Sequence, residues 1–302
     1  MFKHILVPLD GSHLAEAALP AATTLAQTLK APVTLLHIIE QDAPEAVHRD
    51  RHLTDAAEAQ SYLKDVASRF GVKVETHVHT APVQDVARSI VDHAADEFQP
   101  DLIILTSHGN AGMHDLFFGT IAQEVVAAGG TPVMVMKPTE SFGPFNLRRI
   151  LVPLDNESVH DTVLPLATEL AKACKSQLDL LCVIPTYGTD SGEHAAAGTM
   201  LPMTAAAYLD IAEEIAHEHF QAHIEQFEEA DIPATAEIAR GDPATVIAKT
   251  AERIGSDLIL FGTHGRIGLD AFWNRSVTAA VARRTQIPLL LIPVQKDKDS
   301  DA

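Results

Sequence analysis

The feature that most constrains the fold is an internal repeat, because a pattern written twice sets the architecture of both halves. The run ILVPLD at residues 5–10 returns at residues 150–155, and DLIILTSHG at 101–109 returns as DLILFGTHG at 257–265. Pro132 and the apolar residues that follow it return at Pro288. The second interval is longer than the first, so the second copy carries extra residues, most of them around 185–203. The repeat predicts two domains of similar fold in tandem.

Each copy alternates short apolar runs with longer helical patterns. In the first copy the apolar runs cover roughly 4–9, 32–39, 72–79, 101–107 and 132–137. The helical patterns between them cover roughly 12–30, 52–70, 82–97 and 119–129. Continuously apolar strands are covered on both faces, and strand–helix alternation gives right-handed crossovers in a parallel sheet. We therefore expect an α/β chain of two doubly wound, parallel-sheet domains.

The length of the chain agrees with this division, since 302 residues accommodate two domains of about 150 residues each. We place domain 1 at residues 1–140 and domain 2 at residues 147–296. A linker is expected at about 139–146, where Pro138, Gly143 and Pro144 interrupt the pattern. The polar tail at 296–302 is expected to be disordered.

Charge and composition argue against several classes of protein. The chain has 41 acidic and 22 basic residues, and its net charge of −19 repels a phosphate backbone, so we expect no nucleic-acid partner. No stretch approaches the run of about 20 apolar residues that a spanning helix needs, and the first ten residues do not resemble a signal peptide. The two cysteines, Cys174 and Cys182, are typical of reduced thiols. We expect a cytoplasmic protein without membrane segments.

In open α/β sheets, ligands bind beyond the carboxyl ends of the strands, where the strand order reverses. Asp10 and Asp155 directly follow the first strand of each copy. After the fourth strand of the first copy, nine residues separate Gly109 from Gly119, and Thr120 then begins a helical pattern. Free N–H groups at a helix N-terminus suit phosphate, and glycine permits close approach. Alternatively, the glycines shape a turn and Thr120 is an N-cap, and the loop by itself leaves both readings open.

Together, the aspartate after the first strand, the glycine-containing loop and the twofold repeat resemble the universal stress protein family over essentially the whole chain. Nucleotide-binding members of that family share the pattern Gly, two residues, Gly, nine residues, then Gly and Ser or Thr. The resemblance implies a five-stranded parallel sheet in each domain, with ATP, with or without magnesium, bound between the first and fourth strands. The first copy departs at one position, where Thr106 stands in place of the first glycine.

The resemblance also implies roles for individual residues of domain 1. Asp10 would contact the ribose or adenine side of the nucleotide, Ile38 would offer backbone atoms to adenine, and the loop glycines with Thr120 would surround the phosphates. The implied nucleotide-binding set of domain 1 is Asp10, Ile38, Thr106, His108, Gly109, Gly119 and Thr120.

The second copy keeps most of the pattern but has Arg275 where the last glycine is expected. A Cβ there costs about 1–2 kcal/mol if the position needs a positive φ, whereas a guanidinium can itself bind phosphate. We rank this site below the first. The implied set of domain 2 is Asp155, Val183, Gly262, Gly265, Arg275 and Ser276.

Histidines form the other patterns with chemical potential. His219 and His223 lie four residues apart on a predicted helix, and His77 and His79 share a face of a predicted strand. The HExxH motif is absent, because Gln221 occupies its last position. We expect solvated surfaces at these histidines, no metal ligation and no catalytic residue.

The function we expect is that of a stress-response or regulatory protein that binds ATP or a related adenine nucleotide, mainly in domain 1. It would signal through conformation or through an unidentified protein partner. The loop at 110–118 contains no Lys or Arg and no Walker lysine is present, so we expect at most weak hydrolysis. A slow ATPase and a carrier of a non-nucleotide ligand in the second pocket are the alternatives.

The apolar last strands of the two copies carry an expectation about assembly. An unpaired apolar edge strand tends to pair with another strand. By resemblance to dimers of the family, we expect the two domains to pair through these strands, around 133–136 and 289–292. The resemblance also allows a homodimer.

Overall fold

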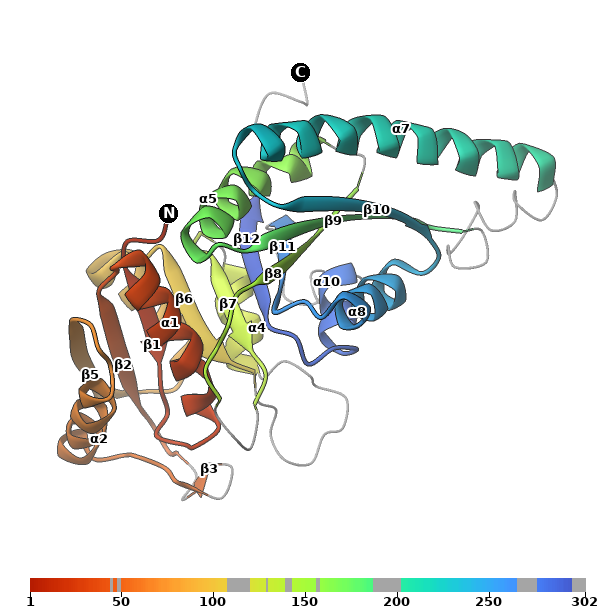
Figure 1. Cartoon of the computed structure of the whole chain (residues 1–302). Coiled ribbons are helices and arrows are strands. Elements are labelled where there is room, and N and C mark those ends of the chain that lie inside the picture. The colour runs from red at the N-terminus through yellow and green to blue at the C-terminus, as the bar shows by residue number, and fades with distance from the viewer. Residues whose placement is uncertain are drawn as a thin grey trace. The chain divides into compact units, whose positions relative to one another are not determined.

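The computed structural model (Figure 1) describes residues 1–43, 46–47, 50–107, 120–128, 130–138, 143–155, 158–186, 202–264 and 276–294. The chain divides into two compact units. Unit 1 takes in Met1–Asn146 and Pro288–Pro293, and unit 2 takes in Leu147–His264 and Arg275–Ile287. The first half of the expected linker, most of the inserted loop and the whole tail lie outside the described residues. None of the described helices combines the length and the apolar character that crossing a bilayer requires.

Unit 1 is built on a sheet with the strand order β12-β7-β6-β1-β2-β5. All neighbouring pairs from β7 to β5 are parallel, whereas β12 runs antiparallel to β7, with Leu289 opposite Val135. The predicted five-stranded parallel sheet is therefore present, and the two runs expected to pair lie side by side in this last ladder. The strands are β1 (Ile5–Pro8), β2 (Val33–Glu40), β5 (Val74–Val83), β6 (Leu102–Thr106), β7 (Val133–Met136) and β12 (Leu289–Val294).

The crossovers between these strands are helical. Leading from β1 to β2 and from β2 to β5, α1 and α2 cover one face of the sheet (Figure 1), and α3 and α4 contact each other on the return path. Asp55 begins α2 as a predictable cap, because its carboxylate accepts hydrogen bonds from the N–H groups of Ala57 and Glu58, each at 2.9 Å. The helices are η1 (Ala15–Ala18), α1 (Leu19–Leu29), α2 (Ala56–Ser68), α3 (Val86–Asp92), the π-helical η2 (His93–Phe98) and α4 (Thr120–Ala128).

Unit 2 repeats the same order with the parallel strands β10-β9-β8-β11. Here α8 contacts α10, as α3 contacts α4 in unit 1. Its strands are β8 (Arg149–Leu154), β9 (Gln177–Ile184), β10 (Ala234–Arg240) and β11 (Leu258–His264). Its helices are η3 (Ser158–Val163), α5 (Leu164–Cys174), α7 (Pro202–Glu229), α8 (Pro243–Ile254) and α10 (Val277–Ala282).

An aspartate just before the fourth strand of each unit anchors the start of the first strand. The Asp101 carboxylate accepts hydrogen bonds from the backbone N–H groups of Lys3, at 2.7 and 2.9 Å, and His4, at 3.0 Å. In unit 2 the Asp257 carboxylate accepts from the N–H groups of Arg148, at 2.7 Å, and Arg149, at 3.0 Å. Both copies of the repeat therefore have the same aspartate clasp, defined as the carboxylate of Asp101 or Asp257 with the backbone N–H groups that it binds. The clasp holds β1 beside β6 and β8 beside β11.

Replacing this aspartate should destabilise either unit. We expect Asp101→Ala to lower the free energy of unfolding by about 1–3 kcal/mol, because backbone donors lose a charged acceptor, and Asp257→Ala to do the same. Urea denaturation measures the change. As a control, Asp96→Ala at an exposed position of η2 should change stability by less than about 0.5 kcal/mol. Equal losses at Asp96 and Asp101 would contradict the clasp.

Candidate functional site

The carboxyl ends of β1, β2 and β6 bring three of the residues implied for domain 1 to one edge of the sheet. β1 lies between β6 and β2, with Ile5 opposite both Leu102 and Val33. Asp10 follows β1 and Thr106 ends β6, while Ile38 lies near the end of β2. The strand order reverses at β1, because the chain passes outward to β2 and β5 and then returns to β6 on the other side. This is the location at which open α/β sheets bind ligands.

A tight turn orients Asp10. Its Oδ1 accepts a hydrogen bond from the N–H of Ser12 at 2.8 Å, and the hydroxyl of Ser12 accepts one from the N–H of Ala15 at 3.2 Å, where η1 begins. Gly11 between them has φ +89°, a conformation that favours glycine. The carboxylate of Asp10 is half-buried and held beside the end of β1. It can therefore accept further hydrogen bonds from a ligand at this edge.

A segment that the sequence did not place here covers the turn. A Cβ built on Gly11 would lie 2.6 Å from Cδ1 of Leu53, so the Leu53 side chain occupies the space above the glycine. The buried His37 ring bridges to this segment, with Nδ1 2.8 Å from the carbonyl oxygen of Leu9 and Nε2 3.0 Å from that of Leu53. A neutral imidazole donates to one of these carbonyls and a protonated ring donates to both. His37 therefore links the cover directly to β1.

Two short strands precede this cover, β3 (Ala46–Val47) and β4 (Asp50–Arg51), and they pair antiparallel. The carboxylate of Asp50 accepts a hydrogen bond from the N–H of His13 at 2.7 Å. Sequence periodicity missed these strands because each has only two residues. The one sequence signal of this cover was His37, a histidine within the mainly apolar run of β2.

At the end of β6, Thr106 and Ser107 are both buried but differ in their hydrogen bonding. The hydroxyl of Thr106 donates to the carbonyl oxygen of Ala15 at 3.2 Å, so this departure from the glycine pattern fastens β6 to η1. Ser107 is 3% exposed, and its hydroxyl has no hydrogen-bond partner among the described residues, which is costly unless something else satisfies it. Successive strand side chains alternate, so the two hydroxyls leave β6 on opposite sides. Sequence reasoning missed Ser107.

A cationic residue, Lys137, also lies at this edge, at the end of β7. The N–H of Ser107 donates to the carbonyl oxygen of Met136 at 2.9 Å, so the ends of β6 and β7 are adjacent. Burial lowers the pKa of the Lys137 ammonium to about 8. A lysine with such a pKa is partly neutral near physiological pH, so its charge responds to its surroundings. This lysine was not among the residues expected from the sequence.

The remaining residues implied for domain 1 belong to the loop after β6. His108, Gly109 and Gly119 lie outside the described residues. Thr120 is the first residue of α4, as the sequence predicted for the helix that follows the loop.

Tyr62 of α2 brings a further polar group close to Asp10. Its hydroxyl is buried without a hydrogen-bond partner of normal geometry. Burial raises the pKa of the Tyr62 phenol well above its usual range, and the negative charges of Glu16 and Asp10 raise it further. The phenol therefore stays neutral, and two carboxylates lie near enough to oppose its ionisation.

In unit 2 the corresponding edge is only partly described. Asp155 follows β8 and is exposed, Val183 is half-buried in β9, and Gly262 lies within β11. Ser276 is the N-cap residue of α10 but makes no side-chain capping bond. Gly265 and Arg275 lie outside the described residues.

The buried Cys182 connects β9 to this edge of unit 2. Burial raises the pKa of its thiol to about 11, and the charge of Asp155 contributes in the same direction. The charge of Asp155 therefore raises the pKa of the Cys182 thiol in β9, as the charge of Asp10 raises the pKa of the Tyr62 phenol in unit 1.

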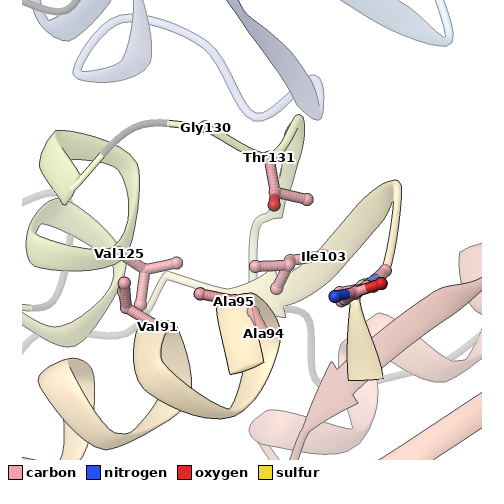
Figure 2. A pocket seen from close by; sticks show the side chains of 9 residues that line it. Val91, Ala94, Ala95, Ile103, Val125, Gly130 and Thr131 are labelled. Carbon is pink, nitrogen blue, oxygen red and sulfur yellow. The ribbon is translucent and has the colours of Figure 1, made fainter. Parts of the chain in front are cut away.

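A cavity of about 390 Å³ lies at the opposite edge of the sheet of unit 1. Figure 2 shows Val91, Ala94 and Ala95 facing Val125 of α4, with Ile103 and Thr131 near the amino ends of β6 and β7. This cavity is separated from Asp10 by the length of the strands. Because ligands of this fold class bind at the carboxyl ends, it is not the candidate site.

Removing the Tyr62 phenol should not cost stability. We expect Tyr62→Phe to raise the free energy of unfolding by up to about 1 kcal/mol, because the variant keeps the ring and removes a buried hydroxyl whose contact with Glu16 is not a hydrogen bond of normal geometry. Tyr208→Phe is the matched control, since Tyr208 is 62% exposed and should give no change. Thermal denaturation at pH 7 distinguishes the two. A loss of stability on Tyr62→Phe would mean that Glu16 accepts a hydrogen bond from the phenol.

Comparisons with known proteins agree with the observed fold and repeat. The model of the universal stress protein family matches residues 1–137 and 146–293. The universal stress protein MJ0531 of Methanocaldococcus jannaschii is 23% identical over 145 residues, which cover 45% of this chain and 83% of that protein. YxiE of Bacillus subtilis, also a universal stress protein, is 26% identical over 153 residues, 45% of this chain and 100% of that protein. The crystal structure of a universal stress protein from Archaeoglobus fulgidus has the same fold, with a TM-score of 0.68 at 17% identity, covering 98% of this chain and 97% of that one. Since its two matched segments span nearly the whole sequence, the chain belongs to the universal stress protein family as a tandem of two such domains.

Proposed function

We propose that domain 1 binds an adenine nucleotide, ATP with or without magnesium, at the carboxyl edge between β1 and β6. We further propose that occupancy of this site makes the chain a regulatory, stress-response protein. The observation that carries the proposal is the reversal of strand order at β1, where Asp10 lies beside β6 and α4 begins at Thr120. Family membership supports the choice of nucleotide.

The groups at this edge match the parts of a nucleotide. Asp10 is suited to accept hydrogen bonds from ribose hydroxyls, because a carboxylate only accepts. The β2–β5 ladder shifts register between Ile38 and Glu40, and such an irregularity frees backbone groups beside Ile38 for the edge of a base. On the other side of β1, the unpartnered Ser107 hydroxyl and the N-terminus of α4 are suited to phosphate oxygens. Thr106 positions the end of β6 against η1, because its hydroxyl already donates to the carbonyl oxygen of Ala15.

The cover over Gly11 provides a way for occupancy to be sensed. Leu53 fills the space above the turn that presents Asp10, so a ribose or base bound there displaces its side chain. The polar contacts described for this segment are those of His37 with Leu53, of His13 with Asp50, of Arg51 with Glu58 at 3.0 Å and of His52 with Glu40 at 3.6 Å. When a ligand displaces Leu53, residues 50–53 move to a second position. This movement changes the surface that a partner protein can contact.

Domain 2 is proposed as the weaker site, because Arg275 replaces the expected glycine. We keep the proposed domain bounds at 1–140 and 147–296, the cytoplasmic location and the pairing of the two domains through their last strands. A homodimer and an unidentified protein partner also remain proposals.

A matched pair of variants tests the site. We expect Asp10→Ala to weaken ATP binding to the full chain by at least about tenfold, or about 1.4 kcal/mol, because the ribose loses its acceptor. Asp155→Ala, the repeat-related change in domain 2, should leave the tighter binding event unchanged. Calorimetric titration measures both, and melting without nucleotide shows whether each variant is folded. The reverse pattern would place the main site in domain 2.

Bound ATP should stabilise the folded chain and should be hydrolysed slowly or not at all. At 100 times its dissociation constant, a ligand bound only by the folded state adds about 2.7 kcal/mol, so ATP with magnesium should raise the melting temperature. Phosphate release should stay far below about 1 per second, because no described arginine lies at this edge to stabilise charge in the transition state and Lys137, whose pKa burial lowers to about 8, is only partly charged. Turnover at enzymatic rates that is lost on Asp10→Ala would make the chain an ATPase.

A further inference from the structure

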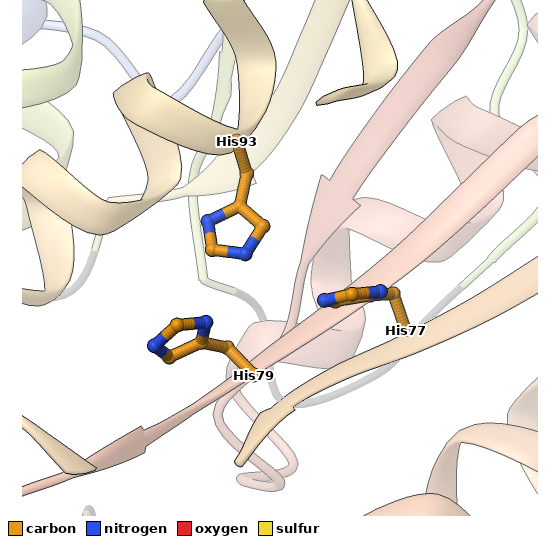
Figure 3. A group of neighbouring side chains, drawn as sticks. All are labelled: His77, His79 and His93. Atoms are coloured by element: carbon orange, nitrogen blue, oxygen red, sulfur yellow. The ribbon is translucent and has the colours of Figure 1, made fainter. Parts of the chain in front are cut away.

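Three histidines of unit 1 converge beside the edge strand β5, away from the candidate nucleotide site. His77 and His79 lie two residues apart on one face of β5, and His93 opens η2 directly opposite them. The ring centroids of His93 and His79 are 4.8 Å apart and those of His93 and His77 are 5.3 Å apart. One ring nitrogen from each histidine lies within 4.8 Å of the others. Figure 3 shows these nitrogens directed toward a shared space.

Hydrogen bonding around the cluster leaves lone pairs available to face this space. Nδ1 of His93 lies 2.7 Å from the carbonyl oxygen of Ser89, so it must donate its proton there and Nε2 must carry the lone pair. Nδ1 of His77 lies 3.5 Å from Oε1 of Glu97, a contact that can orient the ring with Nε2 toward the shared space. A backbone carbonyl and a carboxylate that orient imidazoles in this way are the usual outer partners of metal-binding histidines.

The surroundings also suit a bound cation. Phe98 lies edge-on to His77 with centroids 5.1 Å apart and provides an apolar side to the cluster. Oε2 of Glu97 is 3.8 Å from Nε2 of His93, so a carboxylate is within reach of the same space.

We propose that His77, His79 and His93 bind a divalent transition-metal ion of the zinc class, with Glu97 orienting His77 or completing the coordination shell. Three imidazoles form a recognised tetrahedral set for zinc, with Zn–N bonds of about 2.0–2.1 Å. Imidazole ligands favour zinc, copper or nickel over calcium and magnesium, which prefer oxygen. All three side chains are partly buried, and their ring nitrogens, which lie within 4.8 Å of one another, would move closer to close the set around an ion.

A second cluster, Asp161 with His219 and His223 in unit 2, differs in a way that makes it the control. Oδ2 of Asp161 lies 3.0 Å from Nε2 of His219 and 3.3 Å from Nε2 of His223. One carboxylate therefore lies within reach of both imidazoles, whose Nε2 atoms are 3.4 Å apart, and it can accept an N–H from each ring without a metal. This pairing corrects the expected solvated helix face at His219 and His223, because η3 brings Asp161 against α7.

The test is titration of the metal-free full chain with zinc against a chromophoric chelator, followed by cobalt as a spectroscopic probe. We expect one tight site and visible absorption typical of tetrahedral cobalt. His79→Ala should weaken zinc binding at least about 100-fold and remove that absorption, and Glu97→Gln should weaken binding about 10–100-fold. His219→Ala should leave both readouts unchanged.

Absence of zinc uptake by the unmodified chain would overturn the proposal. So would loss of uptake in His219→Ala with retention in His79→Ala, since the ion would then belong to the second cluster. Circular dichroism of the metal-free variants separates lost binding from lost folding, and His93→Ala replaces His79→Ala as the decisive variant if the latter does not fold.

Discussion

The parallel pairing of β1 with β6 determines where every candidate residue of unit 1 lies. Asp101 holds the amino end of this pair through three backbone hydrogen bonds, and the register that follows brings Asp10 and Thr106 to the opposite edge together. Asp257 repeats the arrangement for β8 and β11. The crossover that follows β1 leads to β2 on one side, whereas β6 lies on the other side of β1. The loops that follow β1 and β6 therefore diverge, and they leave space for a ligand at the carboxyl ends of these two strands.

At that edge, unit 1 combines satisfied and unsatisfied polar groups. Thr106 and His37 use their hydrogen bonds to fasten η1 and the segment around Leu53 to the sheet. Ser107 and Tyr62, in contrast, bury hydroxyls that have no hydrogen-bond partner of normal geometry within the part of the chain that the structure describes. Unsatisfied groups cost stability, and they occur in native proteins mainly where function or a bound molecule accounts for them. The contrast fits a site that is held in place by one set of contacts and completed by a ligand.

The two histidine clusters show how local context decides the chemistry of similar residues. His219 and His223 face the Asp161 carboxylate, which lies 3.0 and 3.3 Å from their Nε2 atoms. His77, His79 and His93 face one another instead, while a backbone carbonyl engages Nδ1 of His93 and Glu97 lies near both His77 and His93. A carboxylate between two imidazoles can accept from both, whereas imidazoles that face one another can offer lone pairs to a cation.

The sequence by itself determined the α/β class, the parallel sheet and the duplication, because apolar periodicity and repeated runs report on local structure and on burial. It also placed Asp10 and Thr106 at strand ends and Thr120 at the start of a helix. Only the tertiary structure decided that Leu53 covers Gly11, that His93 joins His77 and His79, and that Asp161 meets His219. Each of these contacts joins segments that lie 14 to 58 positions apart and carry no shared pattern. Periodicity identifies the face of an element on which a residue lies, but the packing of elements against one another decides what that face meets.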